Sequence, residues 1–202
     1  MRYNIQMVGV GGQGVLLASM VIGETAMRKG MEVTMSEVHG MAQRGGSVTS
    51  TIRMGDDVIS PLIPKGGADL LLAFEPIEAY RSLEYANKDT YIVANTHPII
   101  PITVSMGADE YPDLDYIIEK MRSASSRVIR VNATEIAIEL GGAIATNSVL
   151  IGAVAAVKGF PLSAEELMKS LLDRVPEKFR EMNERAFQTG YQVAKDIMDG
   201  LD

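Results

Sequence analysis

A glycine-rich segment near the start of the chain has the spacing of an anion-binding turn. Gly9, Gly11 and Gly14 form the pattern G-x-G-x-x-G, and Gly12 and Gln13 fill the last gap. Glycines permit a tight turn and close approach of the backbone, while N–H groups at the start of a following helix attract phosphates or carboxylates. The segment predicts a phosphate-cradling turn, and the alternative is a tight turn that binds nothing.

The residues that follow this turn narrow the range of ligands that it could bind. The P-loop of a nucleoside triphosphatase needs Lys and then Ser or Thr after its last glycine, but Val15 and Leu16 stand there. A dinucleotide site needs an acidic residue about 20 positions further on, at the end of the second strand. Glu37 lies near that place. A free-standing NAD(P)- or FAD-binding oxidoreductase is therefore one candidate.

A second glycine-rich loop groups side chains that can transfer protons or bind anions. His39, Gln43 and Arg44 supply an imidazole, an amide and a guanidinium, and Gly45 and Gly46 follow them directly. The loop comes after a predicted strand, and the carboxyl ends of strands are where open α/β sheets bind ligands. We expect these residues to act in catalysis, ligand binding or docking. The alternative is a solvated connection.

Strand and helix patterns alternate along the first two thirds of the chain. The predicted strands are residues 3–8, 31–37, 68–74, 90–94 and 127–131. The predicted helices between them are residues 15–29, 75–86, 114–123 and 132–140. A β-hairpin at about 47–60 is predicted as an insertion, with a turn at 55–57. Such alternation indicates a single Rossmann-like α/β domain, residues 1–202, with a mostly parallel sheet covered by helices on both faces.

From Gly141 onward the pattern is helical, with helices expected over residues 146–158 and 177–198. Ser163 and Glu166 have the spacing of a capping box between these two helices. We expect this region to pack on the sheet or on a partner.

Several polar residues stand at the ends of predicted elements. Asn132 and Glu135 have capping-box spacing, Glu75 and Asn95 follow strands, and Asn147 begins a helix. Asn, Asp and Glu side chains at such places commonly accept backbone N–H groups. We therefore expect Glu75, Asn95 and Asn147 to cap helices or turns before they bind a ligand.

Composition excludes several classes of protein. The 202 residues carry a formal net charge of −7 and contain no cysteine, so this chain provides no thiolates for a disulfide, a zinc site or an iron–sulfur cluster. The two histidines, His39 and His97, stand far apart, and no metal site is expected. The acidic balance argues against nucleic-acid and anionic-membrane binding. The apolar run at 149–157 is too short to span a bilayer, so we expect a cytoplasmic protein.

Four segments together resemble a known family. They are GVGGQGVLLAS at 9–19, SEVHGMAQRGGSV at 36–48, SPLIPKGGADLLLAFEPIEAYR at 60–81 and NSVLIGAVAA at 147–156. In the same order and with similar spacing, they resemble the gamma subunit or gamma domain of 2-oxoacid:ferredoxin oxidoreductases. The form of the second segment is most similar to the small (beta) subunit of the indolepyruvate type.

The resemblance implies a role inside a larger enzyme. Such a complex decarboxylates a 2-oxo acid on thiamine diphosphate, passes electrons through 4Fe-4S clusters to ferredoxin, and delivers the acyl group to coenzyme A. A large partner subunit would hold the thiamine and the clusters, because this chain has no thiamine-binding G-D-G motif, the nearest sequence being Gly55-Asp56-Asp57, and no cysteine. We expect the turn at 9–14 to meet an anion such as the phosphates of coenzyme A, and His39, Gln43 and Arg44 to face a shared active site or dock the large subunit. A purely structural assembly subunit is the alternative.

Overall fold

The core of the molecule is a six-stranded sheet. The structure, a computed structural model, describes residues 1–40 and 45–200. The strands follow the order β2-β3-β1-β4-β5-β6, with all neighbours from β1 to β6 parallel and β3 antiparallel to both β1 and β2. Their bounds are β1 Arg2–Val10, β2 Glu32–His39, β3 Ser47–Gly55, β4 Leu70–Ala73, β5 Tyr91–Asn95 and β6 Arg127–Val131. The predicted mostly parallel α/β sheet is confirmed.

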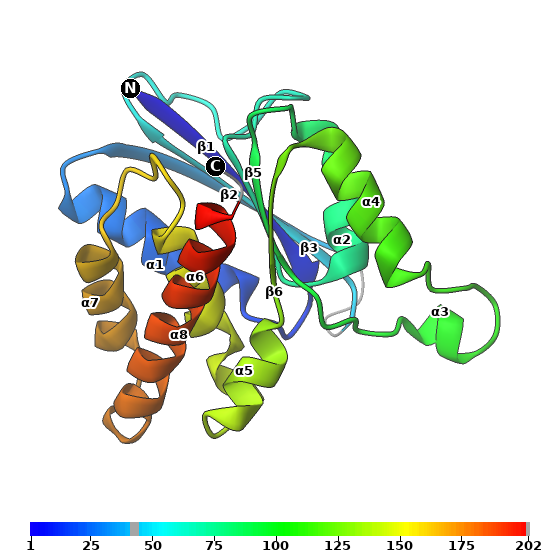
Figure 1. Ribbon diagram of the computed structural model, residues 1–202. Helices are drawn as coiled ribbons and strands as arrows, with labels where there is room; N and C mark the ends of the chain where they lie inside the picture. The colour runs from blue at the N-terminus through cyan, green and yellow to red at the C-terminus, as the bar shows by residue number, and fades with distance from the viewer. Residues whose placement is uncertain (41–44, 201–202) are drawn as a thin grey trace.

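Helices cover both faces of this sheet (Figure 1). The α-helices are α1 Val15–Arg28, α2 Pro76–Arg81, α3 Ile102–Ser105, α4 Leu114–Ala124, α5 Ala133–Glu139, α6 Thr146–Ala155, α7 Ala164–Arg174 and α8 Arg180–Asp199. Helices α2 and α4 lie on one face, and α1 with α5 to α8 lie on the other. Among the helices of the described residues, none combines the length and apolar character needed to cross a bilayer.

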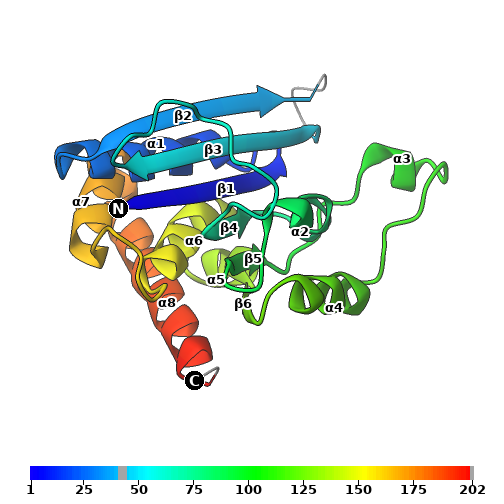
Figure 2. The same ribbon diagram turned by 90° about the horizontal axis from the view of Figure 1, so that it is seen from above.

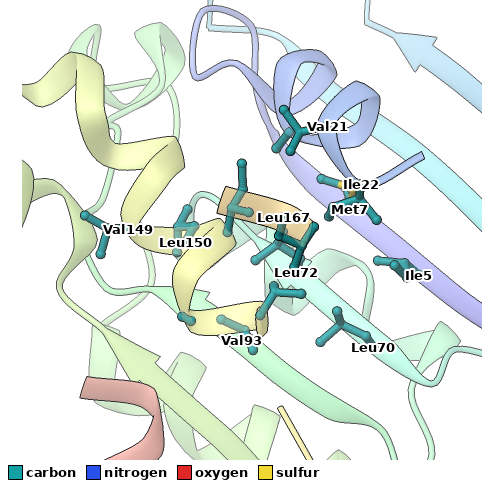
Figure 3. Close-up of a cluster of buried hydrophobic side chains, with 14 of the residues drawn as sticks. Ile5, Met7, Val21, Ile22, Leu70, Leu72, Val93, Val149, Leu150 and Leu167 are labelled. Atoms are coloured by element: carbon teal, nitrogen blue, oxygen red, sulfur yellow. The ribbon is translucent and has the colours of Figure 1, made fainter. Parts of the chain in front are cut away.

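Two hydrophobic clusters sit on the two faces of the sheet. Leu70 and Leu72 of β4 point into the larger cluster, which α1, α6 and α7 complete (Figure 3). Leu71 and Ala73 point into the smaller cluster under α2 and α4. Successive side chains of a strand face opposite sides, so a strand buried on both faces must be apolar throughout. The uninterrupted apolar sequence of β4 therefore places it in the centre of the sheet.

The prediction of an inserted β-hairpin at about 47–60 is wrong, because the strand pairing differs. Residues 47–54 do form a strand, β3, but its partners are β2 and β1, and residues 58–60 form no strand. Alternation shows that a segment is extended and does not show its neighbour. The segment after β3 crosses the sheet beside Arg53, whose guanidinium donates to the carbonyls of Ser60 at 2.7 Å and Leu62 at 3.1 Å. Because β3 pairs with both β1 and β2, strand β2 is an outer strand and β3 separates it from β1.

Three predicted helices have different ends in the structure. Helix α2 stops at Arg81 and a short 3-10 turn follows at Leu83–Tyr85, where one helix over 75–86 was expected. Helix α6 stops at Ala155, and α8 begins at Arg180 after a 3-10 turn. The predicted capping box of Ser163 is confirmed at the start of α7.

The predicted capping box at Asn132 is wrong, because the Asn132 side chain makes no capping bond to α5. A residue from another strand serves that end of the helix. Asn95 Oδ1 accepts from the backbone N–H of Ala133 at 3.1 Å. A contact across the fold therefore replaces the local one that the sequence suggested.

Candidate functional site

The glycine turn joins β1 to α1. Strand β1 ends at Val10 and α1 begins at Val15, with Gly14 as its N-cap residue. Gly12 has φ +100° and Gly14 has φ +76°, backbone angles that residues with a Cβ rarely adopt. Helix α1 has 14 residues, and its N-cap residue Gly14 provides no side-chain cap. Within residues 1–40 and 45–200, the positive end of this helix dipole therefore has no side-chain cap.

Gln13 holds this turn in place. Its Oε1 accepts from the N–H of Val10 at 2.8 Å, and its Nε2 donates to the carbonyl of Phe74 at 2.9 Å. A Cβ on Gly9 would lie 2.9 Å from the Cβ of Phe74, so glycine there permits the close contact between the turn and β4. Both polar atoms of the Gln13 side chain are thus used within the protein.

The second glycine loop lies against the first. Gly11 donates its N–H to the carbonyl of Gly46 at 2.8 Å, and Gly45 donates its N–H to the carbonyl of Gly11 at 3.3 Å. The structure thus brings together two loops that are about 30 residues apart in the chain. Gln43 and Arg44, the two other candidates in this loop, lie outside the described residues.

Glu37 and His39 lie near the end of the outer strand β2. His39 Nε2 is 2.8 Å from Glu37 Oε1, and the His39 side chain is 58% exposed. Strand β3 separates them from the glycine turn, and two strand spacings amount to about 9.6 Å. In a dinucleotide domain the acidic residue ends the strand beside the glycine turn. The strand order therefore gives Glu37 a different position from that of a ribose-binding carboxylate.

A cavity of about 280 Å³ opens beside the glycine turn. It lies where β1 and β5 end, the edge at which open α/β sheets bind ligands. The lining residues are Gly12, Gln13, Gly14, His97, Ile99, Thr134, Ala143, Ile144, Thr146 and Asn147. Sequence reasoning did not propose His97, Thr134 or Thr146 for this site. The available signal was the position of His97 two residues after the polar end of a predicted strand.

Asn147 connects α6 to the turn, and its predicted role as a helix cap is wrong. The N-cap residue of α6 is Ala145, and Asn147 lies in the first turn of the helix. Its Nδ2 donates to the carbonyl of Gly14 at 3.4 Å. Its Oδ1 is buried and has no hydrogen-bond partner within residues 1–40 and 45–200. An unsatisfied buried acceptor costs about 1–3 kcal/mol, so this oxygen is poised for a donor from a bound molecule or water.

Asn95 is a structural residue at the same edge. It is buried, and its Oδ1 accepts from the N–H groups of Ala133 and His97, while its Nδ2 donates to the Phe74 carbonyl and to Thr134 Oγ1. These contacts tie β4, β5 and α5 together. The prediction that Asn95 caps a neighbouring element is confirmed.

Glu75 has a similar role at the end of β4, where its carboxylate is fully buried. One oxygen accepts from the N–H of Glu78 at 3.0 Å, which confirms the predicted cap of α2. The other accepts from the N–H of Ile99 at 3.2 Å and the hydroxyl of Tyr111 at 2.5 Å. Burial raises the pKa of Glu75 above its ordinary value, and the hydrogen bonds oppose that shift only in part.

Exposed apolar side chains occur on α1 and in the lining of the cavity. Leu16, Leu17 and Met20 are exposed on α1. Ile144, in the cavity lining, is 71% exposed. Clustered exposed apolar side chains with a polar centre are typical of surfaces that another protein or a ligand covers.

Metal-ligating side chains do not cluster in the part of the chain that the structure describes. Among the described residues, no group of three or more His, Asp or Glu side chains is placed to hold a metal ion. The whole sequence lacks the cysteines that iron–sulfur clusters require. The turn, by contrast, has the backbone geometry that suits an anion at the start of α1.

These features define an α/β protein with a glycine turn at the carboxyl edge of its sheet and no residues for a cluster of its own. The family model described as pyruvate ferredoxin/flavodoxin oxidoreductase matches residues 4–193. The chain therefore belongs to this family, and the resemblance found in the sequence is confirmed.

Curated relatives and solved structures agree with this assignment. The chain is 45% identical to indolepyruvate oxidoreductase subunit IorB of Methanothermobacter thermautotrophicus, over 96% of this chain and 98% of that subunit. The same subunit of Archaeoglobus fulgidus is also 45% identical, over 96% of each chain. The gamma subunit of a keto/oxoacid ferredoxin oxidoreductase from Geobacter sulfurreducens has a similar structure, with TM-score 0.68, 28% identity and coverage of 95% and 98%.

A longer polypeptide contains the same fold. The 2-oxoglutarate:ferredoxin oxidoreductase of Magnetococcus marinus matches with TM-score 0.74 and 19% identity, over 96% of this chain and 31% of that one. The fold thus occurs both as a separate subunit and as part of a larger chain.

Proposed function

We propose that this chain is the subunit without its own cofactors in an indolepyruvate-type ferredoxin oxidoreductase of the cytoplasm. The observation that carries the proposal is the 45% identity to indolepyruvate oxidoreductase subunit IorB of Methanothermobacter, across 98% of that subunit. The reaction converts an aryl pyruvate and coenzyme A into acyl-coenzyme A, carbon dioxide and one proton, and it transfers two electrons to oxidised ferredoxin.

A large partner subunit holds the cofactors in this proposal. Thiamine diphosphate supplies the decarboxylation chemistry and 4Fe-4S clusters supply electron transfer. The absence of cysteine from this chain supports the placement of the clusters on the partner. This chain then completes the enzyme by shaping the shared active site and by contacting the partner through the apolar side chains around its cavity.

The glycine turn contributes an anion site for coenzyme A. The first turn of α1, which begins at Gly14 without a side-chain cap from that residue, directs backbone N–H groups and the positive end of the helix dipole toward a phosphate. Gly12 and Gly14 take the left-handed backbone that this requires, and Gln13 fixes the turn through Val10 and Phe74. Asn147 Oδ1 supplies an acceptor for an N–H donor of the ligand. The Magnetococcus enzyme with the same fold was solved with coenzyme A bound.

A mixing experiment tests the function. Turnover of indolepyruvate with coenzyme A and a ferredoxin-type acceptor is measured with this chain alone, with the separately produced large subunit alone, and with both. Activity only in the mixture supports the proposal. NAD-dependent oxidation by this chain alone would contradict it in favour of a dinucleotide enzyme, and full activity of the large subunit alone would leave an assembly role.

The second glycine loop faces the active site or the large subunit in this proposal. His39, Gln43 and Arg44 are its functional side chains, with Glu37 beside His39. The variant Arg44→Ala tests the loop. A loss of turnover with normal complex formation assigns Arg44 to the active site, and a loss of complex formation assigns it to docking. If the variant retains both, Arg44 has neither role.

A further inference from the structure

Between β5 and α4 the chain leaves the body of the molecule. Residues 99–111, called the arm here, carry the short helix α3 and project away from the sheet (Figure 2). Within the arm the hydrogen bonds are local: Ser105 donates to the carbonyl of Pro101, Gly107 to that of Val104, and Ala108 to that of Thr103. The arm therefore has its own internal turns, and the hydrogen bonds of Ile99 and Tyr111 to Glu75 connect its base to the body.

The base of the arm is fixed by Glu75. One buried carboxylate oxygen accepts from Ile99 at the beginning of the arm and from Tyr111 at its end. A single side chain at the end of β4 thus joins the two ends of the excursion and sets the direction in which it leaves the sheet. Ile99 also lines the cavity beside the glycine turn. The arm consequently starts at the edge of the candidate site.

The surface of the arm is apolar and acidic. Ile100 is 49% exposed and Met106 is 77% exposed. Asp109 and Glu110 are the charged residues of the segment, and no basic side chain accompanies them in 99–111. Exposed apolar side chains on a projecting segment lose the stabilisation of burial unless another molecule covers them. The pattern fits an apolar socket with basic groups at its margin.

We propose that the arm is the element that docks this chain onto the large, cofactor-carrying subunit. Ile100 and Met106 enter an apolar socket on that subunit, and Asp109 and Glu110 meet basic residues beside it. The inference rests on the proposed function, since it takes its partner from there. The arm begins at the same edge of the sheet as the cavity. Docking through the arm would therefore bring the glycine turn to the shared active site.

The test compares two pairs of exposed apolar residues in the full-length chain. The double variant Ile100→Ser, Met106→Ser removes the apolar contacts of the arm. The matched control Ile59→Ser, Leu62→Ser alters side chains that are 92% and 72% exposed in the segment after β3. The dissociation constant for the separately produced large subunit is measured for each by surface plasmon resonance, and circular dichroism melts verify folding.

The arm variant is expected to bind at least about tenfold more weakly, because buried anchors dominate protein interfaces, while the control binds like the wild type. A folded arm variant with wild-type affinity would overturn the proposal, and so would an equal loss in the control. If the wild-type chain itself neither binds nor activates the large subunit, the proposed function fails instead.

Charge gives a second readout. The variant Asp109→Asn, Glu110→Gln is expected to associate several-fold more slowly at low salt, and the difference from wild type should vanish at high salt, since rim charges act mainly on association. If this variant associates as fast as the wild type at both low and high salt, the proposed basic residues beside the socket are contradicted.

Discussion

Glycine serves opposite purposes in two regions of this molecule. At the crossing of α6 and α8, a Cβ on Gly152 would lie 2.0 Å from the carbonyl oxygen of Phe187, and one on Gly190 would lie 1.9 Å from that of Val149. At the turn between β1 and α1, a Cβ on Gly12 would meet no atom of the described residues within 4 Å, but its φ is +100°. One region needs the absence of a side chain, and the other needs a backbone conformation.

The difference separates stability from ligand binding. The helix crossing is closed, and its glycines let two backbones pack directly against each other. The turn is open, and its glycines leave space in front of the start of α1. Substitutions at the crossing should therefore act on the folded state, while those at the turn should act on the proposed anion site as well.

The largest effect is expected from Gly190→Ala. The new methyl group overlaps the backbone of α6, so the helices must separate, and we expect the free energy of unfolding to fall by about 3 kcal/mol. Urea unfolding measures it. Gly23→Ala in α1 is the control, because that Cβ would meet the movable end of the Met35 side chain. Equal stability of the two variants would mean that the helix crossing does not require glycine at position 190.

Glu75→Gln should have the next largest effect, at the base of the arm. One amide group cannot replace both carboxylate oxygens as acceptors, so an N–H such as that of Glu78 loses its partner, at a cost of about 2 kcal/mol. Burial raises the pKa of Glu75, and the wild type therefore loses stability as pH rises above the ordinary value of 4.5. Gln does not titrate.

The stability difference between wild type and Glu75→Gln should consequently narrow as pH rises. Unfolding midpoints of both proteins, measured from about pH 5 to about pH 8, test whether this difference narrows. A gap that widens with pH would mean that the ionised carboxylate is the favoured form in the folded protein.

Gly12→Ala should cost less stability and reveal the anion site. No atom of residues 1–40 or 45–200 lies within 4 Å of a Cβ at this position, so the expected penalty is the backbone strain of about 1–2 kcal/mol. Gly30→Ala is a matched control, with φ +84° and no atom near its Cβ, beyond the end of α1. Both variants should lose similar stability in thermal melts, but Gly12→Ala alone should raise the KM for coenzyme A in the assembled enzyme. A normal KM would favour a turn that binds nothing.

Ser163→Ala tests the helical region with the smallest change. The Ser163 hydroxyl accepts from the N–H of Glu166 at 3.2 Å, and loss of such a cap costs about 1 kcal/mol. The free energy of unfolding should fall by this amount. At a temperature where the protein is folded, turnover of the assembled enzyme and its KM for coenzyme A should stay unchanged. A change in KM would connect this region to the site.

Local patterns predicted the elements of the candidate site well. The sequence G-x-G-x-x-G after an apolar strand located the turn, because glycine conformation and helix dipoles act over a few residues. The box at Ser163 and the cap at Glu75 were found for the same reason. Asn147 was misassigned because its partner, Gly14, is distant in the chain.

The sequence by itself determined most of the strands and helices, the glycine turn and, through the lack of cysteine, the dependence of any cluster on a partner. Only the tertiary structure decided that β3 lies between β2 and β1, which sets Glu37 away from the turn. It also decided that Glu75 anchors both ends of the arm and that His97 joins the cavity. The physical reason is that strand pairing and side-chain contacts between distant segments depend on the packing of the whole sheet, and periodicity records only which residues are buried.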